Sequence, residues 1–135
     1  MTTASHGADE VAIRALVQNW ARAVRAKDYE GVLAHHAPGM LMFDVPPPPE
    51  SRGLHAYRET WDLFFAAAPD PVVFEIREMV VVAGADVAWV AALMRCAEPG
   101  ANDAWQPLDF RLTIGLRKVD EAWTILHEHH SLPAT

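Results

Sequence analysis

Two short segments of the chain carry the side chains best suited to chemistry. In the first, Asp44 follows the apolar run 40–43 and precedes Pro46. A carboxylate at the end of a buried strand stands against apolar walls, which disfavour its charged form and raise its pKa toward that of a useful general acid or base. The pattern therefore indicates a proton-transfer residue. The alternative is that Asp44 caps the following loop by accepting hydrogen bonds from backbone N–H groups.

The second segment is His127-Glu128-His129-His130, the densest polar cluster in the sequence. Alternation along a strand sends His127 and His129 one way and Glu128 and His130 the other. If the second pair faces a cavity, His130 can act as acid–base partner or orienting donor beside Asp44. The alternative is a polar outer face or a dimer contact. His127 and His129 could also bind Zn²⁺ or Fe²⁺ with a carboxylate, but no third ligand stands at a suitable spacing, so no metal is expected.

The elements that must position these residues follow from hydrophobic periodicity and turn chemistry. The sequence predicts helices at 9–27, 29–36 and 54–68, a short strand at 40–45, and strands at 72–82, 87–96, 105–119 and 123–131. Residues 46–49 are all proline and are expected to form a loop. Short connections make the last four strands antiparallel. The order predicts an α+β domain at 9–133, preceded by a flexible N-terminus at 1–8, with helices covering one face of a curved sheet and a cavity between the layers.

Composition narrows the class of protein. The 135 residues are 51% hydrophobic and carry a formal net charge of −7, which favours one globular domain and disfavours nucleic acid and anionic membrane surfaces as partners. Cys96 is the one cysteine and cannot close an intrachain disulfide, which fits a reducing compartment. The first ten residues show no signal-peptide pattern, and the apolar stretch 79–94 is too short to span a membrane. A cytoplasmic location is expected. No phosphate-binding glycine loop or nucleophile elbow is present, so no cofactor is expected.

Three stretches then give the chain a likeness to a known family: 27–39, Gly53 opening the helix that bears Trp61, and 116–120 leading into 123–131. From about Asp9 to Pro133 the chain resembles the SnoaL-like (polyketide cyclase and ketosteroid isomerase-like) branch of the nuclear-transport-factor-like superfamily. The resemblance implies a cone-shaped fold, with three N-terminal helices packed on a strongly curved, mostly antiparallel sheet. It implies less about the reaction, since the superfamily spans isomerases, dehydratases, cyclases, epoxide hydrolases and non-catalytic binding domains.

The resemblance also implies roles for particular residues. Asp44 falls where ketosteroid isomerases place their aspartate base, and Trp20, 24 positions earlier, falls where they place a tyrosine donor. An indole N–H can donate but cannot act as an acid, and no carboxylate stands on the apolar face of 105–119. Both departures argue against steroid isomerisation, and core packing is the alternative for Trp20. The last stretch also resembles the association domain of calcium/calmodulin-dependent kinases, in which the positions matching Glu128 and His130 line a pocket.

Five further residues are expected to shape the pocket or bind its ligand. The apolar walls are assigned to Trp20, Phe43, Trp89 and Leu112. Arg95 closes the strand 87–96, and if it points inward it can pair with Glu128 or clamp an anionic ligand. If it points outward it is an ordinary surface charge.

These residues predict a cofactor-independent enzyme acting on a small, neutral or weakly anionic, mostly apolar carbonyl compound. Asp44 would remove a proton next to the carbonyl, and His130 would return it or hold the oxygen, which is the first step of isomerisation, cyclisation and dehydration alike. The alternative is a non-catalytic domain of the same fold that binds a small ligand or forms a homodimer through the outer face of its sheet. That face is expected to carry Trp123 and Ile125, whose exposure would favour association.

Overall fold

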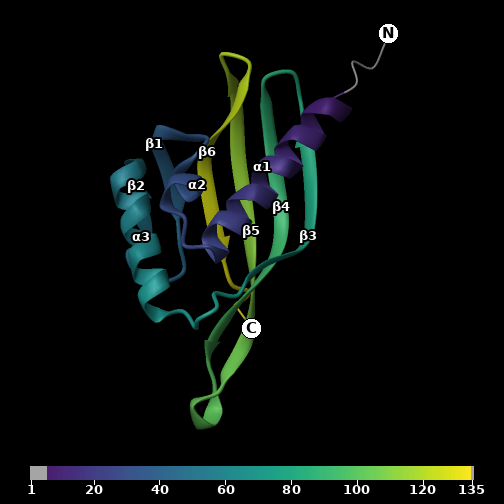
Figure 1. The fold of residues 1–135 in the computed structure, drawn as a ribbon. Coiled ribbons are helices and arrows are strands. Elements are labelled where there is room, and N and C mark those ends of the chain that lie inside the picture. Colours follow the sequence, from purple (N-terminus) through teal and green to yellow (C-terminus); the bar gives the residue numbers. More distant parts are fainter. Residues whose placement is uncertain (1–5, 135) are drawn as a thin grey trace.

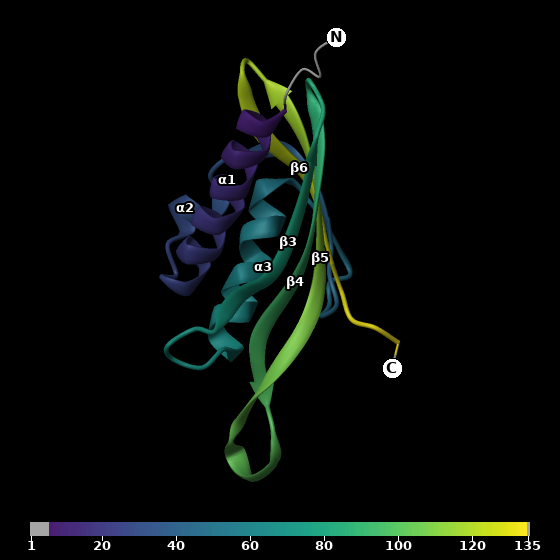
Figure 2. The ribbon, with the colours of Figure 1, turned by 90° about the vertical axis from the view of Figure 1, so that its right-hand side faces the viewer.

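The computed structural model describes residues 6–134 and consists of helices on one face of a curved sheet (Figures 1 and 2). The elements in chain order are α1 (Gly7–Arg25), α2 (Tyr29–Leu33), β1 (His36–Phe43), β2 (Glu50–Arg52), α3 (Gly53–Ala67), β3 (Phe74–Ala83), β4 (Val87–Pro99), the 3₁₀ turn η1 (Ala101–Asp103), β5 (Trp105–Val119) and β6 (Ala122–Ser131). The strand order in the sheet is β2-β1-β6-β5-β4-β3. The β1–β6 pair is parallel and the other pairs are antiparallel. The predicted α+β class is confirmed.

The registers between strands assign each side chain to one face of the sheet. Residues paired across strands share a face, so the row Val81, Val90, Ile114 and Glu128 lies under the helices. Helix α1 supplies the other half of the core with a stripe at three- and four-residue spacing, formed by Ile13, Val17, Trp20, Ala21 and Val24. The sheet therefore has a buried inner face and an outer face that the three helices leave uncovered.

The predicted alternation along β6 is wrong over its first half. The register with β5 shifts between Gly115 and Leu116, which leaves Leu126 as an extra residue in the strand. Such a bulge resets the alternation, because two residues of one strand then oppose one residue of the other. Trp123 and Ile125 are consequently buried in the core, on the same side as Glu128, and do not form an exposed outer patch.

The second helix is shorter than predicted. Asp28 caps it, with Oδ1 accepting a hydrogen bond from the Gly31 N–H at 3.3 Å. The helix ends at Leu33, because His35 takes a left-handed conformation with φ 62° and its carbonyl accepts the Ile125 N–H. The chain then enters β1 at His36, so this residue belongs to the sheet and not to a helix end.

The proline segment forms the bend between β1 and the short strand β2, and the Asp44 N–H donates to the Pro49 carbonyl across it at 3.0 Å. At the N-terminus, residues 1–5 of the predicted flexible segment lie outside the described residues, while Gly7 and Ala8 already belong to α1. No helix within residues 6–134 is long and apolar enough to cross a membrane.

Candidate functional site

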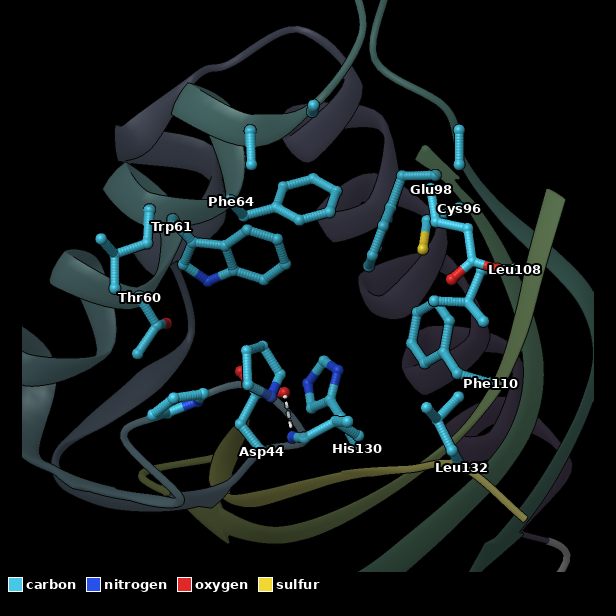
Figure 3. A pocket seen from close by; sticks show the side chains of 18 of the residues that line it. Asp44, Thr60, Trp61, Phe64, Cys96, Glu98, Leu108, Phe110, His130 and Leu132 are labelled. Atoms are coloured by element: carbon cyan, nitrogen blue, oxygen red, sulfur yellow. Dashed lines mark hydrogen bonds between the residues drawn. The ribbon is translucent and has the colours of Figure 1, made fainter. Parts of the chain in front are cut away.

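A cavity of about 510 Å³ lies between the C-terminal half of α3 and the inner face of β4, β5 and β6, next to the loop that follows β1 (Figure 3). Its walls are mainly apolar and aromatic, a composition typical of sites for small organic ligands. The residues that give it chemical character are Asp44, Thr60, Trp61, Phe64, Cys96, Glu98, Phe110 and His130. The sequence predicted Asp44 and His130 as partners, and the fold brings both to this cavity.

Asp44 stands directly after the last residue of β1 and is half-buried at the cavity wall. Burial raises the pKa of its carboxyl group, while the charge of His130 and the Val45 N–H partly oppose that rise. Within residues 6–134 its carboxylate accepts one hydrogen bond, from the Val45 N–H at 2.8 Å. The carboxylate therefore keeps acceptor capacity free for a ligand, since a carboxylate has about four lone-pair sites.

Glu128 is completely buried and accepts three hydrogen bonds from side chains (its Oε2 atom from two of them). The Nε2 atom of His36 lies 2.5 Å from Oε2, and the Tyr57 hydroxyl donates to the same oxygen at 2.7 Å. The Nε2 atom of His130 lies 3.0 Å from Oε1. Burial opposes the charged form of Glu128, but the donors from His130 and His36 outweigh burial and hold its pKa at about 2. Glu128 is therefore an ionised carboxylate inside the core.

The ionised state of Glu128 fixes the protonation of His36. The His36 Nδ1 atom lies 2.9 Å from the Ala34 carbonyl, and the Nε2 atom lies against Glu128. Carbonyl and carboxylate oxygens only accept hydrogen bonds, so both ring nitrogens carry hydrogen and the ring is an imidazolium. Burial works against that charge, but the hydrogen bond and the charge of Glu128 prevail and raise the pKa of His36. The core thus holds a buried ion pair.

The same carboxylate orients His130. Glu128 Oε1 accepts a hydrogen bond from the Nε2 atom of His130. A neutral His130 therefore carries its hydrogen on Nε2 and has its lone pair on Nδ1. The ring also stacks on Phe110, with centroids 5.8 Å apart and planes 11° apart. Figure 3 shows His130 beside Asp44 at the same end of the cavity. This end can take up a proton at Asp44 and at the Nδ1 atom of His130.

Trp20 and Leu112 are buried in the core but do not line the cavity. The Trp20 indole N–H donates to the Tyr57 hydroxyl at 3.0 Å, and its ring packs edge-on against His130. Leu112 pairs with His130 across β5 and β6 and supports it from the neighbouring strand. The expectation that these two residues form pocket walls is therefore wrong, because rings and side chains closer to α3 take that position.

Three other predicted site residues lie on the outer face of the sheet, away from the cavity. Phe43 packs its ring against His127 and His129, and Trp89 is 46% exposed. Arg95 forms an ion pair with Asp109 at 2.6 Å instead of reaching Glu128. The physical reason is alternation: the neighbours Met42, Val90 and Met94 occupy the inner positions of the same strands.

Two residues of the buried network were not expected to have this role. Tyr57 lies within the helix predicted at 54–68, and a buried phenol needs a hydrogen-bond partner, so the sequence contained a usable signal. His36 gave no such signal, since its partner Glu128 lies 92 residues away.

On the outer face of the sheet, His127 contacts the backbone of β1 and lies near His129. The His127 Nδ1 atom lies 2.7 Å from the Leu41 carbonyl, and the rings of His127 and His129 are 6.3 Å apart. In the described part of the chain, no group of three or more histidine, cysteine, aspartate or glutamate side chains is arranged to hold a metal ion.

Comparison with known proteins agrees with this architecture. An NTF2-like protein of unknown function from Pseudomonas putida KT2440 is 32% identical over 93% of this chain and 87% of that chain, with a TM-score of 0.83. A ketosteroid isomerase-like protein from Erwinia carotovora atroseptica SCRI1043 is 21% identical over 93% and 96% of the two chains, with a TM-score of 0.75. The association domain of the C. elegans calcium/calmodulin-dependent protein kinase II is 19% identical over 93% and 96%, also with a TM-score of 0.75.

The fold is therefore that of the NTF2-like superfamily. The family model of the SnoaL-like domain matches residues 13–135, and the chain belongs to this family, as the resemblance predicted. The two structures with identities near 20% show a shared fold alone. No curated protein matches the chain.

Proposed function

We propose that the protein catalyses proton transfer on a small, mainly apolar carbonyl compound without a cofactor, with Asp44 as the general acid–base. The observation that carries the proposal is the position of Asp44, which is half-buried in a mainly apolar cavity beside His130 and accepts, among the described residues, one hydrogen bond from the Val45 N–H. A carboxylate with a raised pKa and free acceptor sites is suited to removing a proton from carbon.

In the proposed step, ionised Asp44 removes a proton from the carbon next to the substrate carbonyl. The electrons of the broken C–H bond form a carbon–carbon double bond, and the negative charge moves to the carbonyl oxygen. Protonated His130 can donate to that oxygen from Nδ1, since Glu128 holds the Nε2–H. Isomerisation, aldol-type cyclisation and dehydration all start from this intermediate.

The experiment is hydrogen–deuterium exchange at the carbon next to the carbonyl of aryl ketones such as propiophenone, followed by proton NMR in D₂O. The wild-type protein is expected to accelerate exchange, and Asp44→Asn to lose about 10²-fold or more of that acceleration. Asp86→Asn, at an exposed bend, is the matched control and is expected to keep it. Since burial raises the pKa of Asp44, ionisation disfavours the folded state, so the melting temperature of Asp44→Asn should equal or exceed that of the wild type. Full exchange activity in Asp44→Asn, or none in the wild type across a ketone panel, would refute the proposal.

A second candidate function, assembly of a homodimer through the outer face of the sheet, is supported by an exposed apolar patch. Val80, Val82, Trp89 and Leu93 are each 45–49% exposed, and the strand registers place them on neighbouring positions of β3 and β4. Contiguous apolar surface of this kind usually marks association. Sedimentation velocity is expected to show a dimer that Leu93→Glu dissociates and that Val11→Glu, on the exposed side of α1, does not. A monomeric wild type at about 100 μM would rule this function out.

A further inference from the structure

We propose that the cavity selects uncharged ligands over carboxylates and phosphates, and that Glu98 is a residue that sets this selectivity. The inference rests on the proposed function, because it takes this cavity to be the substrate site. It narrows the expected substrate, which the sequence left as neutral or weakly anionic, to the uncharged form.

The first observation is the distribution of charge around the cavity. Asp44 lies at the end of β1 and Glu98 near the end of β4, and Figure 3 shows the two carboxylates on opposite sides of the space. Aromatic and aliphatic side chains separate them, among them Phe64, Phe110 and Leu108. A ligand that fills the cavity therefore meets a carboxylate at both ends.

The second observation is that no lysine or arginine among the described lining residues compensates these carboxylates. Among the described residues lining the cavity there is no lysine or arginine, and His130 shares its Nε2–H with Glu128. Arg95 on β4 points outward and forms an ion pair with Asp109. An anionic ligand would thus lose water without gaining the charged partner that usually binds carboxylates and phosphates.

The third observation is that the charge of Glu98 acts inside the cavity and is held in place. The Gln106 side chain on β5 donates to Glu98 Oε2 at 2.9 Å, which restrains the carboxylate on the paired strand. Cys96 lines the same cavity, and burial together with the charge of Glu98 raises the pKa of its thiol to about 11. A carboxylate that disfavours a thiolate there also disfavours a carboxylate on a ligand, since both effects are repulsion between like charges.

The test uses two ligands that share a ring system and differ in charge, 2-acetylnaphthalene and 2-naphthoate, at low ionic strength. Cys96 is the one cysteine of the chain, so the rate at which N-ethylmaleimide modifies it reports occupancy of the cavity independently of any activity. The uncharged ketone is expected to protect Cys96 at a concentration at least about tenfold lower than the carboxylate does. Rates are normalised to each variant without ligand.

Glu98→Gln separates the charge of Glu98 from the shape of the cavity. This variant is expected to strengthen protection by 2-naphthoate about threefold or more and to leave protection by 2-acetylnaphthalene unchanged. Glu30→Gln, at an exposed position of α2, is the matched control and should change neither.

The outcomes decide the inference separately from the proposed function. Equal or tighter protection by 2-naphthoate in the wild type, or no protection by either compound, would overturn the selectivity, whatever Asp44 does in the exchange experiment. If 2-naphthoate protects Cys96 equally well in Glu98→Gln and in the wild type, Glu98 is not the cause of the selectivity. Selective protection together with full exchange in Asp44→Asn would support the inference on ligand charge and refute the catalytic proposal.

Discussion

His130 and Glu128 are two residues apart on β6, their side chains lie on the same face of the sheet, and His130 Nε2 is 3.0 Å from Glu128 Oε1. Through this contact the cavity is connected to a hydrogen-bond network in the core, since Glu128 also binds His36 and Tyr57. The orientation of a side chain at the ligand site therefore depends on residues that no ligand touches.

Replacing Glu128 by glutamine should destabilise the fold by about 3–5 kcal/mol, because the imidazolium of His36 would remain buried without its counter-charge. Urea denaturation measures the free energy of unfolding. The matched control is Glu59→Gln on the exposed side of α3, which should change it by less than about 0.5 kcal/mol. A loss below about 1 kcal/mol in Glu128→Gln would contradict the buried ion pair.

Stability should fall on both sides of a plateau in pH. The pKa of Glu128 is lowered from 4.5 to about 2 in the folded state, so its contribution is full above 4.5 and disappears as pH falls toward 2. The pKa of His36 is raised above 6.5, so its contribution is full below 6.5 and disappears as pH rises through the raised value. The free energy of unfolding, measured across this pH range, should be highest on the plateau and fall on both sides of it in the wild type. In Glu128→Gln both falls should be smaller. Identical profiles for the two proteins would contradict the assignment.

Replacing Tyr57 by phenylalanine should destabilise the protein by about 1–3 kcal/mol. The hydroxyl that is removed donates to Glu128 and accepts from the Trp20 indole, which would be left buried without a partner. Tyr29→Phe is the control, since its hydroxyl donates to the exposed Asp62. Thermal unfolding of both variants tests the difference, and an equal effect of the two would show that burial of the Tyr57 hydroxyl does not matter.

The proposed exchange activity should be lost in acid. A general base must be ionised, and burial raises the pKa of Asp44 above its ordinary 3.8, so the rate should rise with pH through that raised value and then level off. Below it the rate should fall about tenfold per pH unit. Exchange rates from pH 3 to 8 give the profile, and the residual rate of Asp44→Asn should lack this limb. A flat wild-type profile would assign the activity to another group.

Local patterns in the sequence were sufficient to predict the main elements. The apolar stripe of α1, the cap of α2 at Asp28 and the long alternating strand 105–119 all depend on neighbours within a few residues, and the structure contains each of them. The position of Asp44 at the end of the first strand could also be predicted, since an apolar run followed by proline is sufficient to indicate it. The sequence did not indicate which face of the strand 87–96 the helices would cover, and Trp89 was assigned to the wrong face.

The sequence by itself determined the class of fold and placed Asp44 at the end of a buried strand, because periodicity and turn residues act over short distances. Only the tertiary structure decided which side chains meet. The bulge at Leu126 turned Trp123 and Ile125 into the core, and the parallel pairing of β1 with β6 brought His36 to Glu128. Both depend on the register between strands far apart in the chain, and register is set by the packing of whole faces and not by local preference.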